Sequence, residues 1–312
     1  MDHRHRTFGL AFLLCTSTAE AQPKPPIIDM HVHAFGRQVE PDGRPTSLPC
    51  PNDRRPCGNR PPRVTTDAEL IEKIVATMKE HNIVMGVLLG GPLEEDYLRA
   101  GGGRFLRAAK DGSFGGPSVD SVRSLLRSGT AKAVGELPPP YLGLSPADSL
   151  FAPYIALAAE FDVPILTHVA GIGGRFPAYR AAMGRPLLLE DVLKKHPGLR
   201  LYVENAGYPF AEEIVALLYM YPNVSVDVST ITWLIPRPAF HDYLRRLVRA
   251  GFADRIMFGT DQFGYPEITS MALEAIESAT FLTAAQKRGI LYDNAARFLR
   301  LSPAQIAKHH GR

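Results

Sequence analysis

Short apolar runs alternate with amphipathic segments along most of the chain. The runs at 82–89 and 163–168 are rich in β-branched residues. Runs of this length and composition are typical of strands that are buried on both faces. The pattern predicts strands at 27–33, 82–89, 104–109, 131–137, 163–168, 199–205, 224–228 and 255–259.

The segments between these runs have helical periodicity. After Thr66 and Asp67, either of which can cap a helix, apolar residues recur at helical spacing from Leu70 to Met78. We therefore expect a helix there. Further helices are expected at 119–127, 147–161, 187–196, 210–221, 240–250, 267–279 and 283–299.

Alternating strands and helices predict a parallel sheet, and eight such units predict a closed (β/α)₈ (TIM) barrel. The barrel would form one domain over residues 22–312, with helices at its C-terminal end. The unit around 104–109 has the weakest pattern. An open doubly wound sheet is the alternative, but it usually has a Gly-rich phosphate loop after its first strand. Neither Gly101–Gly103 nor the segment 171–174 matches that fingerprint.

Composition excludes some classes of partner. The chain has 312 residues, of which 45% are hydrophobic and 21% charged, as in a globular protein with a large core. Its net charge is only +3, and its Lys and Arg residues are scattered, so nucleic acid is not an expected partner. A small-molecule substrate is expected, and a homo-oligomer is compatible with the sequence.

The first 21 residues have the three parts of a signal peptide in order. Arg4 and Arg6 precede the apolar stretch 8–14, and Ala19-Glu20-Ala21 forms a small-x-small cleavage site. The stretch is too short to span a bilayer, so no stable membrane span is expected after cleavage. This pattern predicts export to the periplasm or the extracellular space. A disordered or membrane-tethered tail is the alternative.

Cleavage would leave two cysteines, Cys50 and Cys57, in a Pro-rich loop at 36–63. In an oxidising compartment two thiols at this spacing favour a small loop disulfide. Two unpaired thiols are the alternative. The long loop is a candidate lid over the site.

Metal-ligand residue types stand at the C-terminal ends of several predicted strands, where barrel enzymes carry their functional residues. His31 and His33 end the first strand, His168 ends the fifth, and Asp261 follows the eighth. Residues two apart on a strand face the same side, so both histidines should point into the barrel mouth. A single His or Asp at a strand end often has a structural role. Convergence from three strands instead predicts a site for a divalent metal, Zn²⁺ first and Mn²⁺ or Fe²⁺ as alternatives.

Glu136 ends the fourth predicted strand and is a further candidate metal ligand. Its carboxylate could bind the same metal, bridge to a second one, or hold a neighbouring His or water. The sequence leaves these roles open.

Several motifs together resemble the amidohydrolase superfamily, most closely its amidohydrolase-related branch, which contains the aminocarboxymuconate semialdehyde decarboxylase-like enzymes. The similar segments are Asp29-Met30-His31-Val32-His33, residues 163–168, 258–261 and 292–299, within a resemblance that runs from about 27 to 301. The resemblance implies the barrel, a catalytic metal, and His31, His33, His168 and Asp261 as its ligands.

One position departs from this pattern. Strand six of the family usually ends in a His, and this chain has Asn205 there, preceded by Glu204. Asn cannot shuttle protons near neutral pH and is a poor transition-metal ligand. The departure disfavours a binuclear site. Glu204 could substitute only if the strand departs from regular alternation, because the two side chains otherwise face opposite sides.

The leading functional hypothesis is a metal-dependent hydrolase of a small amide, ester or lactone. Asp261 would act as general base on a metal-activated water, and Asn205 would donate a hydrogen bond to the oxyanion. Arg175 and Trp233, in predicted loops at the mouth, are candidate substrate contacts, as are Phe35, Tyr141 and Arg237. The alternatives are a metal-dependent non-oxidative decarboxylase and a non-catalytic ligand-binding barrel.

Overall fold

A computed structural model describes residues 24–39, 64–173 and 176–312 of the chain. The proposed signal peptide at 1–21, the two loop cysteines and Arg175 lie outside these residues. The strands are β1 Ile27–Val32, β2 Ile83–Leu88, β3 Phe105–Ala109, β4 Ala133–Leu137, β5 Ile165–Thr167, β6 Leu201–Val203, β7 Val224–Asp227 and β8 Ile256–Met257. The longer helices are α1 Asp67–Glu80, α2 Glu94–Gly101, α3 Val119–Arg127, α4 Ala152–Glu160, α6 Ala211–Met220, α8 Arg237–Arg249 and α9 Glu267–Glu277. The shorter ones are α5 Glu190–Lys195, α7 Ile231–Leu234, α10 Ala284–Arg288, α11 Asn294–Phe298 and α12 Pro303–His309.

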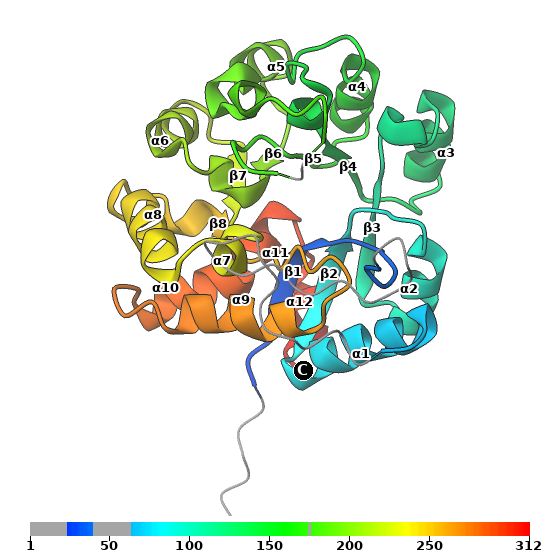
Figure 1. Cartoon of the computed structure of the whole chain (residues 1–312), viewed down its shortest axis with the longest axis vertical. Coiled ribbons are helices and arrows are strands. Elements are labelled where there is room, and N and C mark those ends of the chain that lie inside the picture. Colours follow the sequence, from blue (N-terminus) through cyan, green and yellow to red (C-terminus); the bar gives the residue numbers. More distant parts are fainter. Residues whose placement is uncertain (1–23, 40–63, 174–175) are drawn as a thin grey trace, which may run out of the picture.

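The eight strands form a nearly closed parallel barrel surrounded by helices (Figure 1). Each strand from β1 to β7 pairs in parallel with the strand that follows it in sequence. Two backbone hydrogen bonds join the first strand to the last unit, from Met30 N–H to the Phe258 carbonyl (2.9 Å) and from Asp261 N–H to the His31 carbonyl (2.8 Å). The predicted (β/α)₈ barrel is confirmed, including its weak third strand.

Apolar side chains form two layers, one inside the barrel and one between the barrel and its helices. The inner layer comprises Ile28, Met30, Val87, Leu89, Ala108, Ala133, Leu166, Tyr202 and Met257, packed against Tyr292 and residues of α11. The outer layer lies between strands and helices and includes the α1 residues Leu70 and Ile74. Helix α1 begins where the sequence predicts, because the Thr66 hydroxyl accepts the backbone N–H of Glu69 at 3.1 Å. The filled interior makes the barrel a rigid support for the residues at its upper end, by which we mean the end where the C-terminal ends of the strands lie.

Several helical segments differ from the prediction. The expected helix at 147–161 begins only at α4, because the Asp148 carboxylate accepts the backbone N–H of Leu150 (3.0 Å) and stabilises a turn instead. The expected helix at 283–299 is divided by a π-helical turn at Gly289–Asp293. Helices α2 and α12 were not predicted, since each is too short to give a clear helical period.

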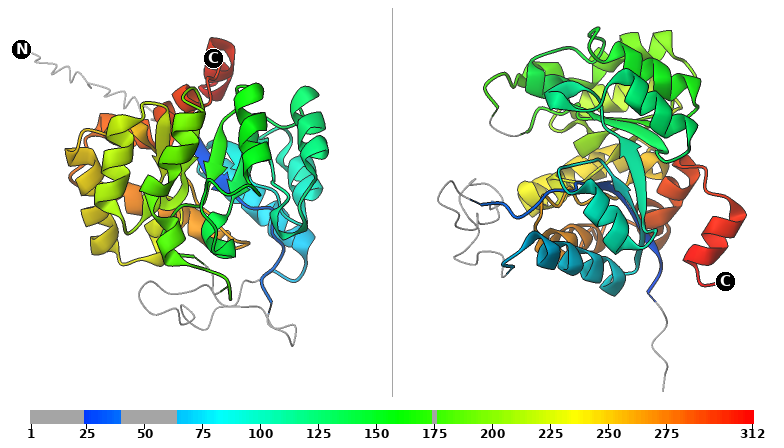
Figure 2. Two further views of the ribbon diagram at one scale, coloured as in Figure 1. Left: turned by 90° about the horizontal axis from the view of Figure 1, so that it is seen from above. Right: turned by 90° about the vertical axis from the view of Figure 1, so that its right-hand side faces the viewer.

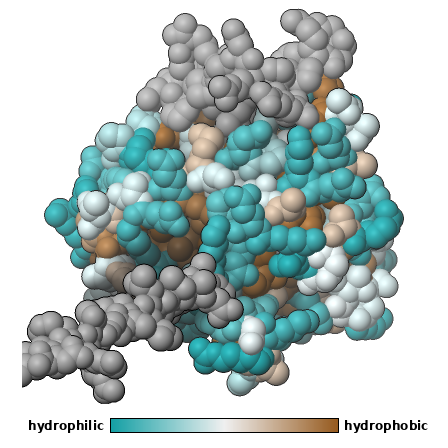
Figure 3. All heavy atoms as spheres, turned by 90° about the horizontal axis from the view of Figure 1, so that it is seen from below, coloured by the Kyte–Doolittle hydropathy of each residue, from teal (hydrophilic) through white to brown (hydrophobic). Residues whose placement is uncertain are grey.

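The C-terminal part closes the lower end of the barrel. The Asn294 side-chain amide donates to the carbonyls of Ala253 (2.9 Å) and Ile256 (2.7 Å), which ties α11 to β8. Helix α12 then stands out from the body (Figure 2). One face of the molecule is mainly hydrophilic, with hydrophobic side chains visible between the polar ones (Figure 3). None of the described helices is long and apolar enough to cross a membrane.

One buried charge lies after β3. Asp111 is fully buried, and one of its carboxylate oxygens accepts hydrogen bonds from the Ser113 N–H (3.2 Å) and hydroxyl (2.5 Å). The other oxygen has no hydrogen-bond partner among the described residues. Burial raises the pKa of Asp111 to about 6.

Replacing Tyr202 tests the packing inside the barrel. Its buried hydroxyl donates to the Met30 carbonyl at 2.5 Å. Tyr202→Phe leaves that carbonyl without its donor and should lower the free energy of unfolding by about 1–2 kcal/mol, measured by urea denaturation. Tyr219→Phe, at a largely exposed position on α6, is the control and should have no effect. Equal midpoints for Tyr202→Phe and the parent would contradict this packing role.

Asp111→Asn tests the buried carboxyl group. The pKa of Asp111 in the folded state lies above its ordinary value of 3.8. Asp111 therefore stabilises the folded state most below pH 3.8, and this stabilisation is lost as the pH rises through about 6. The unfolding free energy of the variant minus that of the parent should therefore rise by up to about 3 kcal/mol between pH 4 and pH 7. Parallel stability curves over that interval would show that Asp111 titrates normally.

Candidate metal centre

The upper end of the barrel collects titratable side chains from six strands. They are His31 and His33 from β1 and the residue after it, Glu136 from β4, His168 after β5, Glu204 after β6, Asp227 at the end of β7 and Asp261 after β8. All are buried except Glu136, which is partly exposed. The predicted convergence of strand-end residues is therefore present, with two additional carboxylates.

His31, His33 and Asp261 meet at one point. The two Nε2 atoms are 3.2 Å apart, and Asp261 Oδ1 lies 3.3 Å from each of them. Glu136 Oε2 is 3.4 Å from His33 Nε2. The prediction that both histidines face the mouth is confirmed. A register shift in the β1–β2 pairing between Asp29 and Val32 accounts for Met30 and His31 both lying inside the barrel.

The hydrogen bonds of His31 determine which of its nitrogens is available. Its Nδ1 lies 3.0 Å from Asp227 Oδ2, and a carboxylate can only accept, so Nδ1 carries the hydrogen. The Nε2 lone pair of the neutral ring then points toward Asp261 Oδ1, which has no hydrogen-bond partner among the described residues. Two acceptors 3.3 Å apart in a buried site require a cation or a proton between them. These donor atoms fit a divalent metal ion.

The pKa shifts report the same excess of negative charge. Burial lowers the pKa of His31, but the carboxylates of Asp261, Glu204 and Asp227 outweigh burial and raise it well above its ordinary value. Burial raises the pKa of Asp261, but the charge of His31 and the close approach of His33 outweigh it and lower that pKa. The group therefore attracts positive charge.

His168 belongs to a second group, on the other side of Glu136. Its Nδ1 lies 3.1 Å from Glu136 Oε1, and its Nε2 lies 2.8 Å from the Ile172 carbonyl. One potential ligand atom each from Glu136, His168 and Glu204 lie within 4.8 Å of one another. The predicted ligands thus occupy two overlapping groups, which share Glu136.

The chain turns sharply after β6 and brings Glu204 to the mouth. The strand ends at Val203, and Asn205 and Ala206 have left-handed φ values of 57° and 49°. Strand alternation therefore no longer applies at Glu204, whose side chain is completely buried. Burial, followed by repulsion from Glu136, raises the pKa of Glu204 well above its ordinary value.

Asn205 supports the loop after β7. Its Oδ1 accepts hydrogen bonds from the Thr230 N–H (2.9 Å) and the Ser229 hydroxyl (3.2 Å), which fixes the orientation of the amide. Its Nδ2 is buried and has no acceptor among the described residues. One amide donor therefore remains available.

Sequence reasoning missed three residues that hold the ligands in place. Asp227 binds His31 Nδ1, and the Thr230 hydroxyl donates to Asp261 Oδ2. The Asp29 carboxylate accepts the Thr260 N–H (2.9 Å) and hydroxyl (2.7 Å), which links β1 to the segment after β8. Asp227 could have been found, because it is a polar residue at a strand end. Asp29 opens the motif at residues 29–33, so it too had a signal, whereas Thr230 has no distinctive one.

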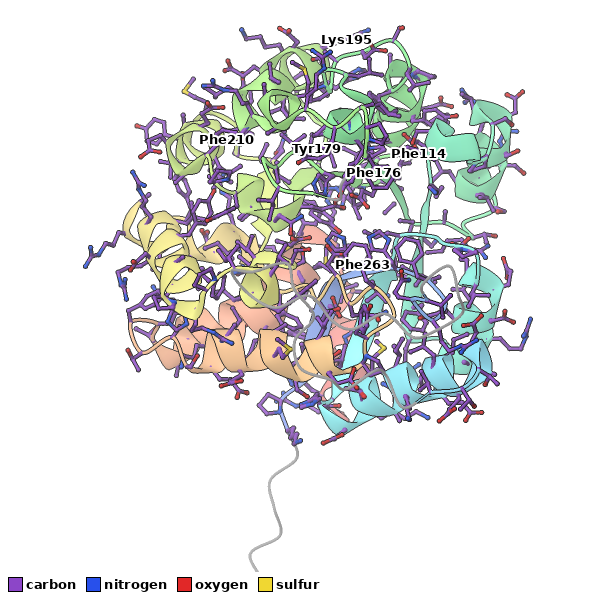
Figure 4. All side chains as sticks on the ribbon, in the orientation of Figure 1. Phe114, Phe176, Tyr179, Lys195, Phe210 and Phe263 are labelled. Carbon is purple, nitrogen blue, oxygen red and sulfur yellow. The ribbon has the colours of Figure 1, made fainter. Side chains whose placement is uncertain are left out.

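Aromatic rings surround the histidines. Phe35 stacks on His33 with ring centroids 4.8 Å apart, and Phe263 stacks on the same ring at 5.3 Å. Tyr141 packs edge-on against His168 at 4.7 Å and also contacts Phe176 and Tyr179. Phe176, Tyr179 and Phe263 lie over the centre of the molecule in Figure 4. The rings make the approach to the metal centre largely aromatic.

Two residues that were predicted to contact substrate from loops, Trp233 and Arg237, make contacts within the protein instead. Trp233 is 4% exposed, and its indole N–H donates to the Thr260 carbonyl at 2.8 Å, so in this structure it supports the backbone beside Asp261. Arg237 reaches the Met271 carbonyl on α9 (3.4 Å) instead of the histidines. A substrate contact by Trp233 stays a prediction, and Arg175 lies outside the described residues.

Solved structures share this fold at low sequence identity. One is a probable 2-pyrone-4,6-dicarboxylic acid hydrolase from Acinetobacter baumannii, 13% identical, with 88% of this chain and 99% of that chain covered and a TM-score of 0.59. Another is 4-oxalomesaconate hydratase from Rhodopseudomonas palustris, 17% identical, with 91% and 98% covered and a TM-score of 0.59. Decarboxylases are also among the similar structures. At these identities the likeness shows the fold alone.

Sequence comparisons identify the family. Protein fluG of Emericella nidulans is 26% identical over 82 residues, which are 26% of this chain and only 10% of that protein. The family model described as Amidohydrolase matches residues 28–301, which include all of the barrel strands apart from Ile27, the first residue of β1. The chain therefore belongs to the amidohydrolase family.

Proposed function

We propose that this protein is a metal-dependent hydrolase of small amides, esters or lactones. The observation that carries the proposal is the meeting of His31 Nε2, His33 Nε2 and Asp261 Oδ1 within 3.3 Å of one another. Three acceptor-type atoms in a buried site favour a bound cation over an empty space. The family membership supports an enzyme, and the reaction class is our inference.

Two imidazoles and a carboxylate suit a borderline ion, so Zn²⁺ is the proposed metal, with Mn²⁺ or Fe²⁺ as alternatives. When bound, such an ion lowers the pKa of a coordinated water from 15.7 to about 7 and polarises a carbonyl. Asp227 keeps the His31 ring in the tautomer that leaves Nε2 free. Glu136 lies beside the same point, and His168, the remaining proposed ligand, contacts the other oxygen of Glu136.

Asp261 is the proposed general base. The Thr230 hydroxyl holds Asp261 Oδ2, which leaves Oδ1 directed toward the two histidines. Asp261 would take a proton from the attacking water and deliver it to the leaving oxygen or nitrogen as that bond breaks. Asn205 Nδ2, the free donor of a fixed amide, would stabilise the oxyanion.

The aromatic approach favours a planar or apolar acyl group. Phe35 and Phe263 stack in parallel with the His33 ring, and Tyr141 presents its edge to His168. Flat groups gain both area burial and ring contacts in such surroundings. Aryl esters and unsaturated lactones are therefore the first substrates to test.

Metal content tests the proposal directly. The purified full chain should contain about one equivalent or more of a divalent transition metal, measured by elemental analysis, and chelation should abolish hydrolysis of an ester, lactone and amide panel. The double variant His31→Asn/His33→Asn should lose the metal, whereas His81→Asn, at the C-cap of α1 where the ring contacts Ser270 on α9, should keep it. No bound metal, even after incubation with Zn²⁺ or Mn²⁺, would remove the proposed mechanism. CO₂ release from aromatic acids without hydrolysis would replace it with decarboxylation.

Asp261→Asn tests the general base. The amide keeps the size of the carboxylate and can still accept from Thr230, but it cannot take a proton. We expect kcat to fall by about 10²–10⁴-fold in steady-state assays. Asp242→Asn, at an exposed position on α8, is the matched control and should retain full activity. A near-parental kcat for Asp261→Asn would exclude this role.

A further inference from the structure

We infer that the N-terminal end of the barrel holds a separate binding site for an organic molecule that carries a phosphate group. The site is an open cavity of about 980 Å³ between α12 and the segments where β1, β2 and β3 begin. It lies at the end of the barrel opposite to the metal centre, whose residues stand at the C-terminal ends of the strands. The hydrolysis mechanism above uses none of its residues.

The cavity has an excess of positive charge. Its charged lining residues are Lys24, Arg104, Arg288 and Lys308, and no Asp or Glu of the described residues lines it. The carboxylate of Asp293 lies 3.5 Å from Arg288 Nε. The other three cations form no ion pair within the described ranges. An anion that entered the cavity would therefore meet several positive groups without a competing carboxylate on its walls.

Hydrogen bonds hold the two guanidinium groups in place. Arg104 donates from one terminal nitrogen to the Ile83 carbonyl at 3.3 Å, and its other N–H groups have no partner in the described part of the chain. Arg288 donates to the Pro26 carbonyl at 3.0 Å and lies over the ring of Tyr292 at 4.6 Å. The planar fork of an anchored guanidinium matches the oxygens of a phosphate group and loses little freedom on binding.

Two histidines at the C-terminal end of α12 report the positive potential. His309 Nδ1 lies 3.0 Å from the Tyr292 hydroxyl, and His310 Nε2 lies 3.3 Å from a terminal nitrogen of Arg288. Burial, followed by nearby positive charges, lowers the pKa of both rings. Those charges include Lys308 for His309 and Arg288 for His310. Surroundings that disfavour a further proton favour an anion for the same electrostatic reason.

The size and the apolar part of the lining indicate which anion fits. Pro25, Pro26, Val84 and Met85 line the cavity together with the charged residues. Small-molecule sites usually have volumes of about 300–1,000 Å³, so inorganic phosphate would leave most of this cavity empty. Several cations also favour a phosphate group, with a charge of about −1.5 to −2, over a single carboxylate. These features favour a phosphate monoester with an apolar organic body.

Calorimetry with 1-naphthylphosphonate tests the site, because this anionic probe has an apolar ring and no ester bond to hydrolyse. The full chain should bind it at low ionic strength, and added salt should weaken binding. Arg104→Gln/Lys308→Gln should weaken binding by about 10–100-fold, because hydrogen bonds to charged groups are lost. Lys194→Gln/Lys195→Gln, on α5 and outside the cavity lining, removes the same charge and should bind as the parent does.

A second comparison separates this site from the metal centre. His31→Asn/His33→Asn should bind the probe as tightly as the parent, so the result does not depend on the proposed function. No binding to the parent, or equal affinity in Arg104→Gln/Lys308→Gln, would overturn the inference. Loss of binding in the histidine variant alone would assign the probe to the metal centre and overturn it as well. If the double cavity variant does not fold, which circular dichroism would reveal, the single variant Lys308→Gln, at an exposed position, decides the question.

A lipid headgroup and a soluble metabolite could both supply this chemistry. Centrifugation with vesicles of phosphatidylcholine and phosphatidic acid distinguishes the two sources. Sedimentation of the parent with the vesicles, abolished in Arg104→Gln/Lys308→Gln, would support the site with a lipid as its ligand. Protein that binds the probe but stays in the supernatant would support the site with a soluble ligand.

Discussion

Nitrogen and oxygen atoms of the site side chains lie close together in a buried part of the barrel mouth. The surrounding residues are arranged to hold them there. The Nε2 atoms of His31 and His33 and the carboxylate of Asp261 approach within 3.3 Å of one another. Such an arrangement is unfavourable unless positive charge occupies it. Asp227, Thr230 and their neighbours hold the rings and carboxylates in this arrangement.

The barrel makes this arrangement possible because it joins residues that are distant in sequence. Asp29 receives both hydrogen bonds of Thr260, 231 positions later, so the first and last strands hold their ligands at a defined separation. The apolar interior below, from Ile28 to Met257, is closely filled and excludes water from beneath the site. Local mobility of the ligands is thereby limited, which favours a preorganised metal centre over one that assembles on binding.

The fold alone does not select the reaction. Barrels of similar shape include a hydrolase, a hydratase and decarboxylases, so the chemistry depends on what stands at each strand end. In this chain the sixth strand is distinctive. The turn at Asn205 and Ala206 places a carboxylate in the mouth and uses the Asn205 amide to support the next loop. Aromatic rings pack against His33 and His168 beside it.

The sequence by itself determined the alternation of strands and helices, and with it the barrel, because hydrophobic period depends on local geometry. It also predicted that His31, His33, Glu136, His168 and Asp261 would lie together as candidate metal ligands, since parallel strands bring their C-terminal ends together. Only the tertiary structure divided these residues into two groups that share Glu136. It alone placed Glu204 in the mouth and bonded Trp233 to the backbone beside Asp261. Side-chain direction after a strand ends depends on backbone turns and long-range hydrogen bonds, which no local pattern encodes.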